Sequence, residues 1–229
     1  MKEWKIAFYR TLPVLFGYIF LGLAFGVLMQ QAGYGPLWSL AASVFVYAGS
    51  MQFLMVELLS SGATLGLTAA MTLLLNSRHL FYGLSFIEKF RKLGSIRHYL
   101  VFAMSDETYS VLCGLPDELS SGGLMGRIAF LDQLYWVAGS VLGAFVGSVL
   151  PFDTTGIDFS MTALFVVIFV EQWLNAKSHL PALIGLVFSL LFLILLGPDR
   201  FILPALIATV AALLGTRQKV EKQLGGEAA

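Results

Sequence analysis

Charge is scarce in this sequence: only 12% of its 229 residues are Asp, Glu, Lys or Arg, whereas 58% are hydrophobic. A soluble domain of ordinary composition has about 25% charged and about 45–50% apolar residues. No charged residue occurs from Thr11 through Val56, a run of 46 residues. One membrane-spanning helix needs about 20 apolar residues. The composition therefore excludes an ordinary soluble enzyme and indicates an integral membrane protein.

The sequence also lacks the residues that most catalytic and metal centres need. Its single cysteine, Cys113, excludes an internal disulfide and a cysteine-cluster metal site, and its three histidines lack ligand spacing. It contains no nucleophile elbow, phosphate-binding loop, dinucleotide fingerprint or HExxH motif. Fourteen basic residues balance fourteen acidic ones, and no basic block has interleaved aromatics. We therefore predict no enzymatic activity, no metal, no cofactor and no nucleic-acid partner.

Continuous apolar runs, separated by turn-like breaks, predict membrane-spanning helices, which satisfy their own backbone polar groups in lipid. The breaks contain Pro36, Pro151 and Pro198, and the last one is so short that the final two helices must form an antiparallel hairpin. The fold class is therefore all-α, with seven or eight transmembrane helices. The seven predicted spans are Leu12–Met29, Pro36–Leu59, Thr64–Ser85, Ile128–Leu150, Phe159–Asn175, Leu180–Leu196 and Phe201–Leu214.

The segment Tyr99–Leu115 leaves the number of spans open, because it is apolar but has Asp106 and Glu107 at its middle. It could be a short span, a re-entrant element or a helix buried among the others. Basic residues concentrate on the cytoplasmic side. The basic cluster from Lys89 to Arg97 and the basic N-terminus cannot both be cytoplasmic if three spans separate them. The alternatives are seven spans with an external N-terminus, which we favour, and eight spans with both termini inside.

A weak internal repeat supports seven spans. At an offset of 120 residues, Gln52-Phe53-Leu54 aligns with Gln172-Trp173-Leu174. Two three-helix units that enter the membrane from opposite sides are the inverted repeats of many secondary transporters, which bind substrate near the midplane. We predict one transmembrane domain, consisting of repeat 1 (residues 12–85), a connecting element (86–127), and repeat 2 (128–196) followed by a final helix (201–214).

Small residues recur at a spacing of four, which places them on one face of a helix, where backbones can approach closely. Helix packing explains this pattern better than a hinge or a substrate contact does. The glycines are Gly22 and Gly26, Gly62 and Gly66, and Gly139, Gly143 and Gly147.

The second predicted span contains Gly49, Ser50 and Gln52 in a charge-free environment. A Gly/Ser pair is a recognised place for a helix to kink. An interrupted helix would expose backbone groups to a cavity, and transporters hold the carboxylate and ammonium of an amino acid in this way. Gln52 would add a neutral donor and acceptor, or would simply bond to a neighbouring helix.

The third predicted span ends in a polar group formed by Asn76, Arg78 and His79. A charge at the depth of Arg78 is costly unless it is paired or its side chain reaches the interface. Asn76 and His79 are three residues apart and share a helix face. These three residues are candidates for substrate binding.

Three acidic residues, Asp106, Glu107 and Asp132, are candidates for proton coupling. A carboxylate that is shielded from water binds its proton more tightly and can carry it at physiological pH. The pair Asp106-Glu107 has no structural explanation in the middle of an apolar segment. Asp132 lies near Arg127 and could instead be an ordinary acid near the start of a helix.

Five motifs in this order and spacing resemble the AzlC family, from about Gly17 to Leu214. Each is weak alone, but together they are fairly specific to that family. They are Phe20–Gly26, Tyr47–Phe53, Asn76–Tyr82, Ser105–Tyr109 and Asp132–Trp136.

The resemblance implies a multi-pass exporter in the bacterial cytoplasmic (inner) membrane for the branched-chain amino acids valine, leucine and isoleucine, with methionine as a further candidate. It also implies coupling to the proton gradient and a small, separately encoded AzlD-like membrane subunit as partner. We place the substrate site around Gly49–Gln52, Asn76–His79 and the segment with Asp106. The alternatives are a non-transporting regulatory or scaffold subunit, and a passive channel for small neutral solutes.

Overall fold

The computed structural model describes residues 2–149, 178–197 and 201–223, together with single residues between 159 and 174. All regular elements within these residues are helices, so the prediction of an all-α protein is confirmed for this part of the chain. The chain divides into two compact units, Met1–Leu164 and Phe165–Ala229. The first unit contains every candidate site residue.

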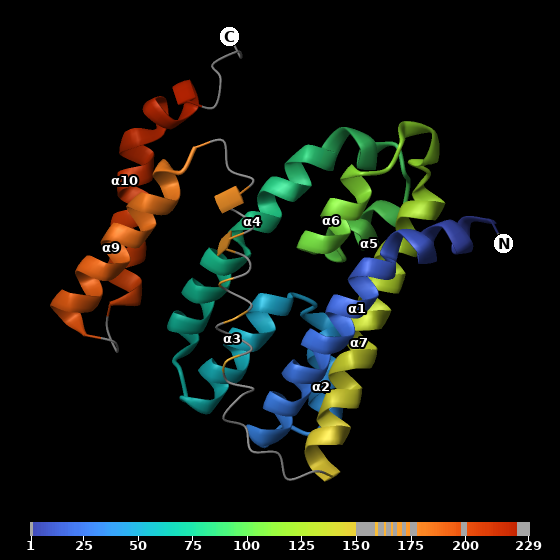
Figure 1. Cartoon of the computed structure of the whole chain (residues 1–229), viewed down its shortest axis with the longest axis horizontal. Helices are drawn as coiled ribbons and strands as arrows, with labels where there is room; N and C mark the ends of the chain where they lie inside the picture. Colours follow the sequence, from blue (N-terminus) through green and yellow to red (C-terminus); the bar gives the residue numbers. More distant parts are fainter. Residues whose placement is uncertain are drawn as a thin grey trace. The chain divides into compact units, whose positions relative to one another are not determined.

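Three long helices form the frame of the first unit: α1 (Lys2–Gln31), α4 (Leu65–Arg91) and α7 (Gly122–Val149) (Figure 1). At about 1.5 Å per residue, each is longer than the roughly 30 Å hydrocarbon core of a bilayer. Two of them, α1 and α7, are long and apolar enough to span a membrane by length and composition. In α4 the apolar stretch covers only Leu65–Ser77.

The helices α1 and α7 run parallel, side by side. Near their beginnings, Glu3 of α1 forms an ion pair with Arg127 of α7. Near their ends, a Cβ added at Gly147 of α7 would lie 3.3 Å from Cβ of Gln30 on α1. Both helices therefore begin at one end of the unit, which we name the N-end, and finish at the other, the C-end.

Glycines allow this close approach of α1 and α7. A Cβ at Gly26 would overlap the carbonyl oxygen of Ser140, and a Cβ at Gly143 would overlap the carbonyl oxygen of Leu23. These neighbours are backbone atoms, which cannot rotate away as a side chain can. The same interface contains the other glycines that the sequence pattern selected for this role, Gly22, Gly139 and Gly147.

The predicted span Pro36–Leu59 is wrong as a single helix, because the structure divides it into α2 (Pro36–Phe45) and α3 (Gly49–Ser60). The interruption lies directly before the Gly49-Ser50 pair at which the sequence predicted a kink. Within it, Tyr47 has a φ of 42°, in the left-handed region that non-glycine residues rarely adopt. The α2–α3 pair starts and finishes at the C-end (Figure 1).

The segment Tyr99–Leu115 is also interrupted, and contains parts of α5 (Ile96–Phe102) and α6 (Asp106–Cys113). At the start of this pair, Ile96 lies 3.2 Å from the position of a Cβ at Gly122, the first residue of α7. After α6, the carbonyl of Gly114 accepts a hydrogen bond from Arg10 near the start of α1. The α5–α6 pair therefore starts and finishes at the N-end.

The sequence pattern at Gly62 and Gly66 predicts one shared helix face, and this prediction is wrong. Gly62 lies in the turn between α3 and α4 with a φ of 63°, a conformation that glycine adopts without strain. Gly66 lies in α4, and a Cβ at either glycine would meet nothing within 4 Å.

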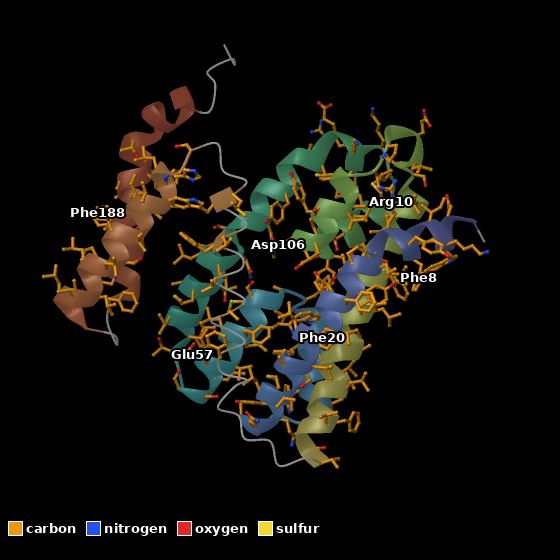
Figure 2. The ribbon with its side chains drawn as sticks, viewed as in Figure 1. Phe8, Arg10, Phe20, Glu57, Asp106 and Phe188 are labelled. Atoms are coloured by element: carbon orange, nitrogen blue, oxygen red, sulfur yellow. The ribbon has the colours of Figure 1, made fainter. Side chains whose placement is uncertain are left out.

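Large apolar side chains remain exposed on the first unit, as expected for a surface that faces lipid. On α1, Phe8 and Phe20 are 43% and 70% exposed (labelled in Figure 2), and on α2 Phe45 is 78% exposed. The buried core takes side chains from all the α-helices of the first unit, α1 to α7, and includes Phe25, Phe53, Phe86, Leu100, Leu112 and Ile128.

In the second unit, α9 (Leu180–Leu196) packs against α10 (Ile202–Gln223). A Cβ at Gly185 of α9 would lie 3.9 Å from Thr209 of α10. The short connection between them makes this pair the antiparallel hairpin that the sequence predicts, with α9 at the predicted bounds. The predicted span Phe159–Asn175, and with it the aligned segment Gln172–Leu174 of the predicted repeat, lies largely outside the described residues.

Candidate functional site

The two interruptions meet in the middle of the first unit. The ring of Tyr47, in the α2–α3 interruption, lies 6.3 Å from the ring of Phe102 at the end of α5. Beyond the interruptions, α3 begins at Gly49 and α6 begins at Asp106. Both short helices therefore direct their N-termini, which carry a partial positive charge, toward the interior of the unit.

The start of α6 explains the acidic pair that the sequence left without a structural reason. Ser105 caps this helix, because its Oγ accepts a hydrogen bond from the backbone N–H of Thr108 at 3.1 Å. Asp106 and Glu107 occupy the first turn, where the helix dipole stabilises negative charge. Asp106 (labelled in Figure 2) accepts a hydrogen bond from the hydroxyl of Tyr82 on α4 at 2.6 Å.

A chain of hydroxyl groups connects the start of α6 to α1 and α7. The hydroxyl of Tyr18 lies 2.6 Å from Oε2 of Glu107 and 2.7 Å from Oγ of Ser105. Ser105 Oγ lies 3.0 Å from Oγ1 of Thr108. Thr108 donates to Oδ2 of Asp132 at 2.8 Å. We call the side chains of Tyr18, Ser105 and Thr108 the hydroxyl chain, and it links two carboxyl groups.

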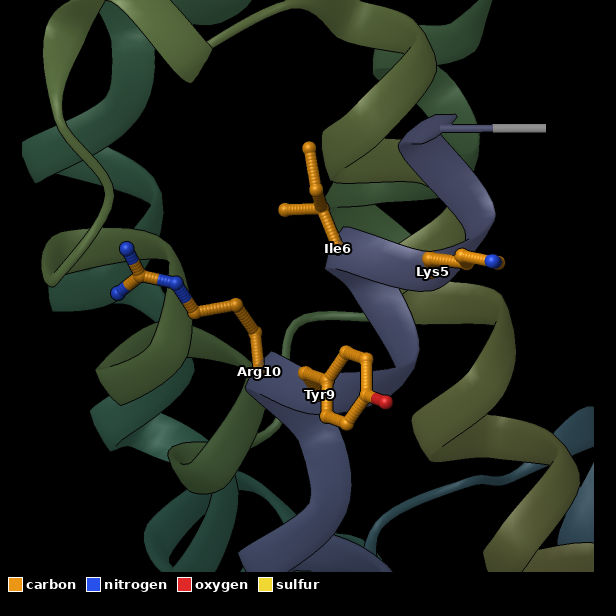
Figure 3. A pocket seen from close by; sticks show the side chains of 4 residues that line it. All are labelled: Lys5, Ile6, Tyr9 and Arg10. Atoms are coloured by element: carbon orange, nitrogen blue, oxygen red, sulfur yellow. The ribbon is translucent and has the colours of Figure 1, made fainter.

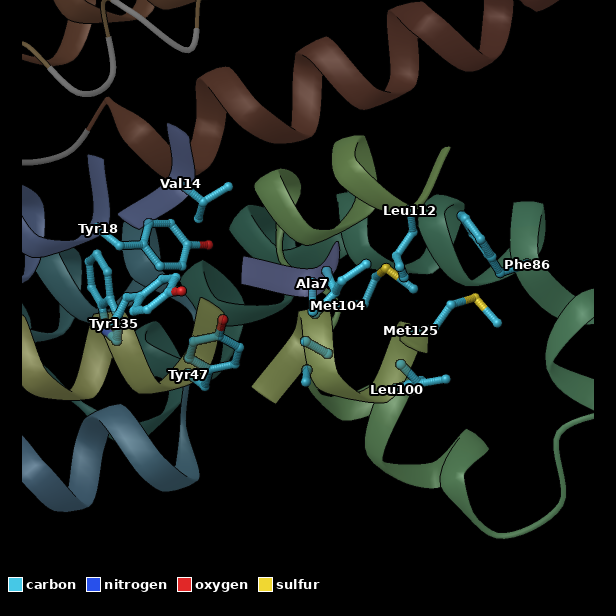
Figure 4. Close-up of a cluster of buried hydrophobic side chains, with 14 of the residues drawn as sticks. Ala7, Val14, Tyr18, Tyr47, Phe86, Leu100, Met104, Leu112, Met125 and Tyr135 are labelled. Carbon is cyan, nitrogen blue, oxygen red and sulfur yellow. The ribbon is translucent and has the colours of Figure 1, made fainter. Parts of the chain in front are cut away.

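Asp132 is fully buried, and the interpretation of this residue as an acid near a helix start is wrong because α7 begins well before it, at Gly122. Its Oδ1 has no hydrogen-bond partner among the described residues. The hydroxyl of Tyr47, also buried, has no such partner either, and it interacts electrostatically with Asp132. Figure 4 shows the hydroxyls of Tyr18 and Tyr47 directed toward one region. A buried oxygen without a partner is costly, so this region is suited to a proton or a polar ligand.

Gln52 is fully buried, and its amide group holds the α2–α3 interruption in place. Its Oε1 accepts hydrogen bonds from Nε1 of Trp136 at 2.9 Å and from the backbone N–H of Ala48 at 3.2 Å. Its Nε2 donates to Oγ of Ser43 at 3.3 Å. Because Trp136 also packs against Gly49, Gln52 fixes the start of α3 against α7.

Gln133, the residue after Asp132, connects the two interrupted pairs. Its Oε1 accepts a hydrogen bond from the hydroxyl of Tyr99 on α5 at 2.8 Å. Its Nε2 donates to the backbone carbonyl of Val44 at 3.2 Å, one of the carbonyls that the end of α2 leaves without a helical partner. One turn of α7 therefore supports both interruptions.

The described contacts of the polar group of α4, which consists of Asn76, Arg78 and His79, do not include Gln52. The ring of His79 lies 5.8 Å from the ring of Tyr82, which bonds to Asp106. Oδ1 of Asn76 is buried and has no hydrogen-bond partner among the described residues. The backbone of Arg78 lies in the interior of α4, and its side chain lies outside the described part of the structure. The ring of His79 is thus connected to the start of α6 through Tyr82.

Sequence reasoning selected Asp132, Glu107 and Gln52 but missed the hydroxyl chain. Thr108 and Ser105 belong to the Ser105–Tyr109 motif, from which only the two acids are selected as site candidates. Tyr18 stands in an apolar run with no polar neighbour to mark it.

Surface hollows occur at the N-end, away from this buried network. One is lined by Lys5, Ile6, Tyr9 and Arg10 (Figure 3). Another lies beside Trp4, Lys92 and Arg127. Among the described residues, no three His, Cys, Asp or Glu side chains gather as metal ligands.

Comparison with known proteins gives a consistent result. The model of the AzlC protein family matches residues 13–150. The chain is 40% identical over 220 residues to the "Branched-chain amino acid transport protein AzlC" of Bacillus subtilis. The aligned residues cover 95% of this chain and 87% of that protein. It is 36% identical to an "Uncharacterized membrane protein" of Haemophilus influenzae over 96% of this chain and 91% of the relative.

A more distant relative is the "Inner membrane protein YgaZ" of Escherichia coli, which is 31% identical over 180 residues, covering 73% of this chain and 72% of that protein. No solved structure matches the chain. The family match lies within the first unit and includes both interruptions and the hydroxyl chain. This chain belongs to the AzlC family.

Proposed function

We propose that this chain is the transporting subunit of a secondary transporter that exports branched-chain amino acids across the bacterial cytoplasmic membrane in a proton-coupled manner. The observation that carries the proposal is the meeting of two interrupted helix pairs near the buried carboxyl group of Asp132 and the partly buried carboxyl group of Glu107. Interrupted helices at mid-depth are a frequent way for transporters to bind substrate. The name of the Bacillus relative supports branched-chain amino acids, and so valine, leucine and isoleucine, as substrates. Methionine is a further candidate.

The residues divide into three roles. The start of α3, at Gly49 and Ser50, offers backbone N–H groups and a positive helix end to the substrate carboxylate. Gln52 shapes this start through its bonds to α2 and α7 rather than through a free amide. Asp132 is the first candidate for the proton carrier because its Oδ1 is buried and has no hydrogen-bond partner among the described residues, and Glu107 is the second.

The polar group of α4, which consists of Asn76, Arg78 and His79, forms the second part of the proposed substrate site. Asn76 has a buried carbonyl oxygen available for a substrate ammonium, and Arg78 and His79 flank it on the same helix. Asp106 begins α6 and is held by Tyr82, so we place it at the edge of the proton-coupling group. A small AzlD-like membrane subunit is the proposed partner.

The test is counterflow of radiolabelled valine into proteoliposomes that contain this chain with or without the small subunit, under an imposed pH gradient. Exchange that requires the small subunit and accelerates with the gradient is the expected result. A scaffold would leave export intact after substitution of Asn76 and Asp132. A passive channel would give a flux that does not respond to the gradient, and absence of exchange in a folded complex would reject the substrate class.

We also propose a membrane topology in which α1, α4 and α7 cross the membrane while the α2–α3 and α5–α6 pairs enter from opposite sides and return. The start of α1, the end of α4 and the start of α7 then lie together at the N-end, as the contact between Leu93 and Gly122 supports. The basic N-terminus, the cluster from Lys89 to Arg97 and Arg127 all become cytoplasmic. With Phe159–Asn175, α9 and α10 as further crossings, the chain crosses six times and both termini are cytoplasmic.

Single cysteines distinguish this topology from both spanning alternatives. In a Cys113→Ala background, Gln31→Cys at the end of α1 and Ser61→Cys after α3 are both expected to react with an impermeant maleimide on intact cells. Ser95→Cys and Ser121→Cys, at the N-end, are expected to react only after permeabilisation. If Pro36–Leu59 crosses the membrane, Gln31→Cys and Ser61→Cys react from opposite sides, and that result would reject the returning α2–α3 pair.

A further inference from the structure

Building on the proposed function, we propose that the hydroxyl chain is a proton relay: Tyr18, Ser105 and Thr108 pass the coupling proton between Glu107 and Asp132. The relay assigns a role in transport to three residues that carry no charge. It also assigns the two carboxyl groups to opposite ends of one path, rather than to two independent proton sites.

Geometry supports a continuous path. The four steps from Glu107 to Asp132 join oxygen atoms 2.6, 2.7, 3.0 and 2.8 Å apart, each within hydrogen-bonding distance. Thr108 and Asp132 are fully buried, and Tyr18 is 5% exposed. The five groups come from α1, α6 and α7, so the path depends on tertiary packing and not on one helix. In such a water-poor site, hydrogen-bonded groups polarise one another.

The proton balance is complete in either direction. When Glu107 holds the proton and Asp132 is ionised, Glu107 donates to Tyr18, Tyr18 to Ser105, Ser105 to Thr108, and Thr108 to Asp132. Transfer breaks the O–H bond of Glu107 and forms one on Asp132, while each hydroxyl gives up one proton and receives another. Afterwards all three hydroxyls donate in the reverse direction, and Tyr18 then donates to an ionised Glu107.

Ser105 can serve as helix cap and relay at the same time. A hydroxyl oxygen has two lone pairs and one proton. In both directions Ser105 Oγ accepts from the backbone N–H of Thr108 with one lone pair and from one neighbouring hydroxyl with the other. Capping alone requires neither the hydrogen bond from the Thr108 hydroxyl to Asp132 nor the hydrogen bond between the Tyr18 hydroxyl and Ser105. These two contacts are therefore the ones that capping does not explain.

Other titratable groups surround the path. Tyr47 from the α2–α3 interruption, Tyr99 from α5 and Tyr135 from α7 interact electrostatically with Asp132, and Tyr47 also interacts with Glu107 and Thr108. Asp106, next to Glu107, bonds to Tyr82 of α4. Tyr135 is bonded through its hydroxyl to Thr11, at 3.2 Å, so it offers a tyrosine outside the relay for comparison with Tyr18.

The experiment compares valine uptake driven by a pH gradient with valine counterflow in the same proteoliposomes, which contain the full chain and its small subunit. In Thr108→Val and Tyr18→Phe proteins, the ratio of gradient-driven uptake to counterflow is expected to fall to the value measured without a gradient. Thr108→Ser restores the hydroxyl and is expected to restore the ratio. Tyr135→Phe, the matched control, is expected to keep the wild-type ratio.

A gradient response that persists in Thr108→Val, or that falls equally in Tyr135→Phe, overturns the relay. Infrared spectra provide a readout that does not depend on the substrate. Substituting Glu107→Gln should shift the Asp132 carboxyl band of the purified complex, and Thr108→Val should abolish this shift. If wild-type protein shows no valine exchange, the proposed function fails, and the infrared comparison alone decides whether the relay exists.

Discussion

Replacing Gly26 with leucine is expected to destabilise the fold severely. A Cβ at this position would overlap the carbonyl oxygen of Ser140 and lie 2.5 Å from the backbone nitrogen of Ala144. Overpacking against movable side chains costs about 1–3 kcal/mol, and overlap with backbone costs more because α1 and α7 must separate. We expect the thermal unfolding temperature in detergent to fall by more than about 5 °C, or the monodisperse protein to be lost.

The control for this prediction lies on the same helix. A Cβ at Gly17 would meet nothing within 4 Å, so Gly17→Leu should change the free energy of unfolding by no more than about 0.5 kcal/mol. Gly143→Leu, which reaches the backbone of Leu23 from the other helix, should reproduce the effect of Gly26→Leu. Equal tolerance of leucine at Gly17 and Gly26 would show that α1 and α7 do not pack in this way.

The packing glycines could be selected from the sequence because small residues at a spacing of four leave a periodic signal. The break before Gly49 could be predicted for a similar reason, since a Gly/Ser pair disfavours a continuous helix. Both signals are local. They depend on residues a few positions apart, and the geometry of a helix converts this separation directly into a position on its surface.

The direction of a chain after such a break is not a local property, and here the prediction of one continuous helix over Pro36–Leu59 is wrong. Pro36–Leu59 has the length and hydropathy of a span. Neither its length nor its hydropathy indicates whether α3 continues in the direction of α2 or turns back beside it. The conflict between the basic N-terminus and the cluster from Lys89 to Arg97 was the available signal. It arose because Pro36–Leu59 was counted as a crossing, and the α2–α3 geometry that we propose removes it.

In the candidate site too, features that depend on neighbouring residues could be predicted, whereas features that depend on tertiary contacts could not. Polar residues in an apolar run are visible in the sequence, so Gln52, Asp106 and Asp132 could be selected. Their partners could not be, because a hydroxyl such as that of Tyr18 acquires meaning only through a contact with Glu107, 89 positions away. The amide of Gln52 is hydrogen-bonded to Trp136, Ala48 and Ser43. We therefore interpret Gln52 as a residue that holds the site in shape and not as a direct substrate ligand.

Substitution of Asp132 by asparagine is expected to produce the largest functional loss in the chain. Asparagine has nearly the same shape and can still accept the hydrogen bond from Thr108, so the fold should be retained. It cannot exchange a proton, and loss of a group that transfers protons typically costs a factor of about 10²–10⁴ in rate. Gradient-driven valine uptake should therefore fall to the level measured without a pH gradient, in protein whose unfolding temperature matches the wild type.

Asp106→Asn is the matched comparison, because the sequence makes Asp106 a candidate for proton coupling alongside Glu107 and Asp132. Asp106 accepts from Tyr82 at the start of α6, and an asparagine there can keep that bond and the same place in the first turn. The hydroxyl chain ends at Asp132 and Glu107, so Asp106→Asn should keep most of the gradient response. The reverse result, with Asp132→Asn active and Asp106→Asn inactive, would move the proton site to the side of α6 that faces α4 and would reject both Asp132 as carrier and the path that leads to it.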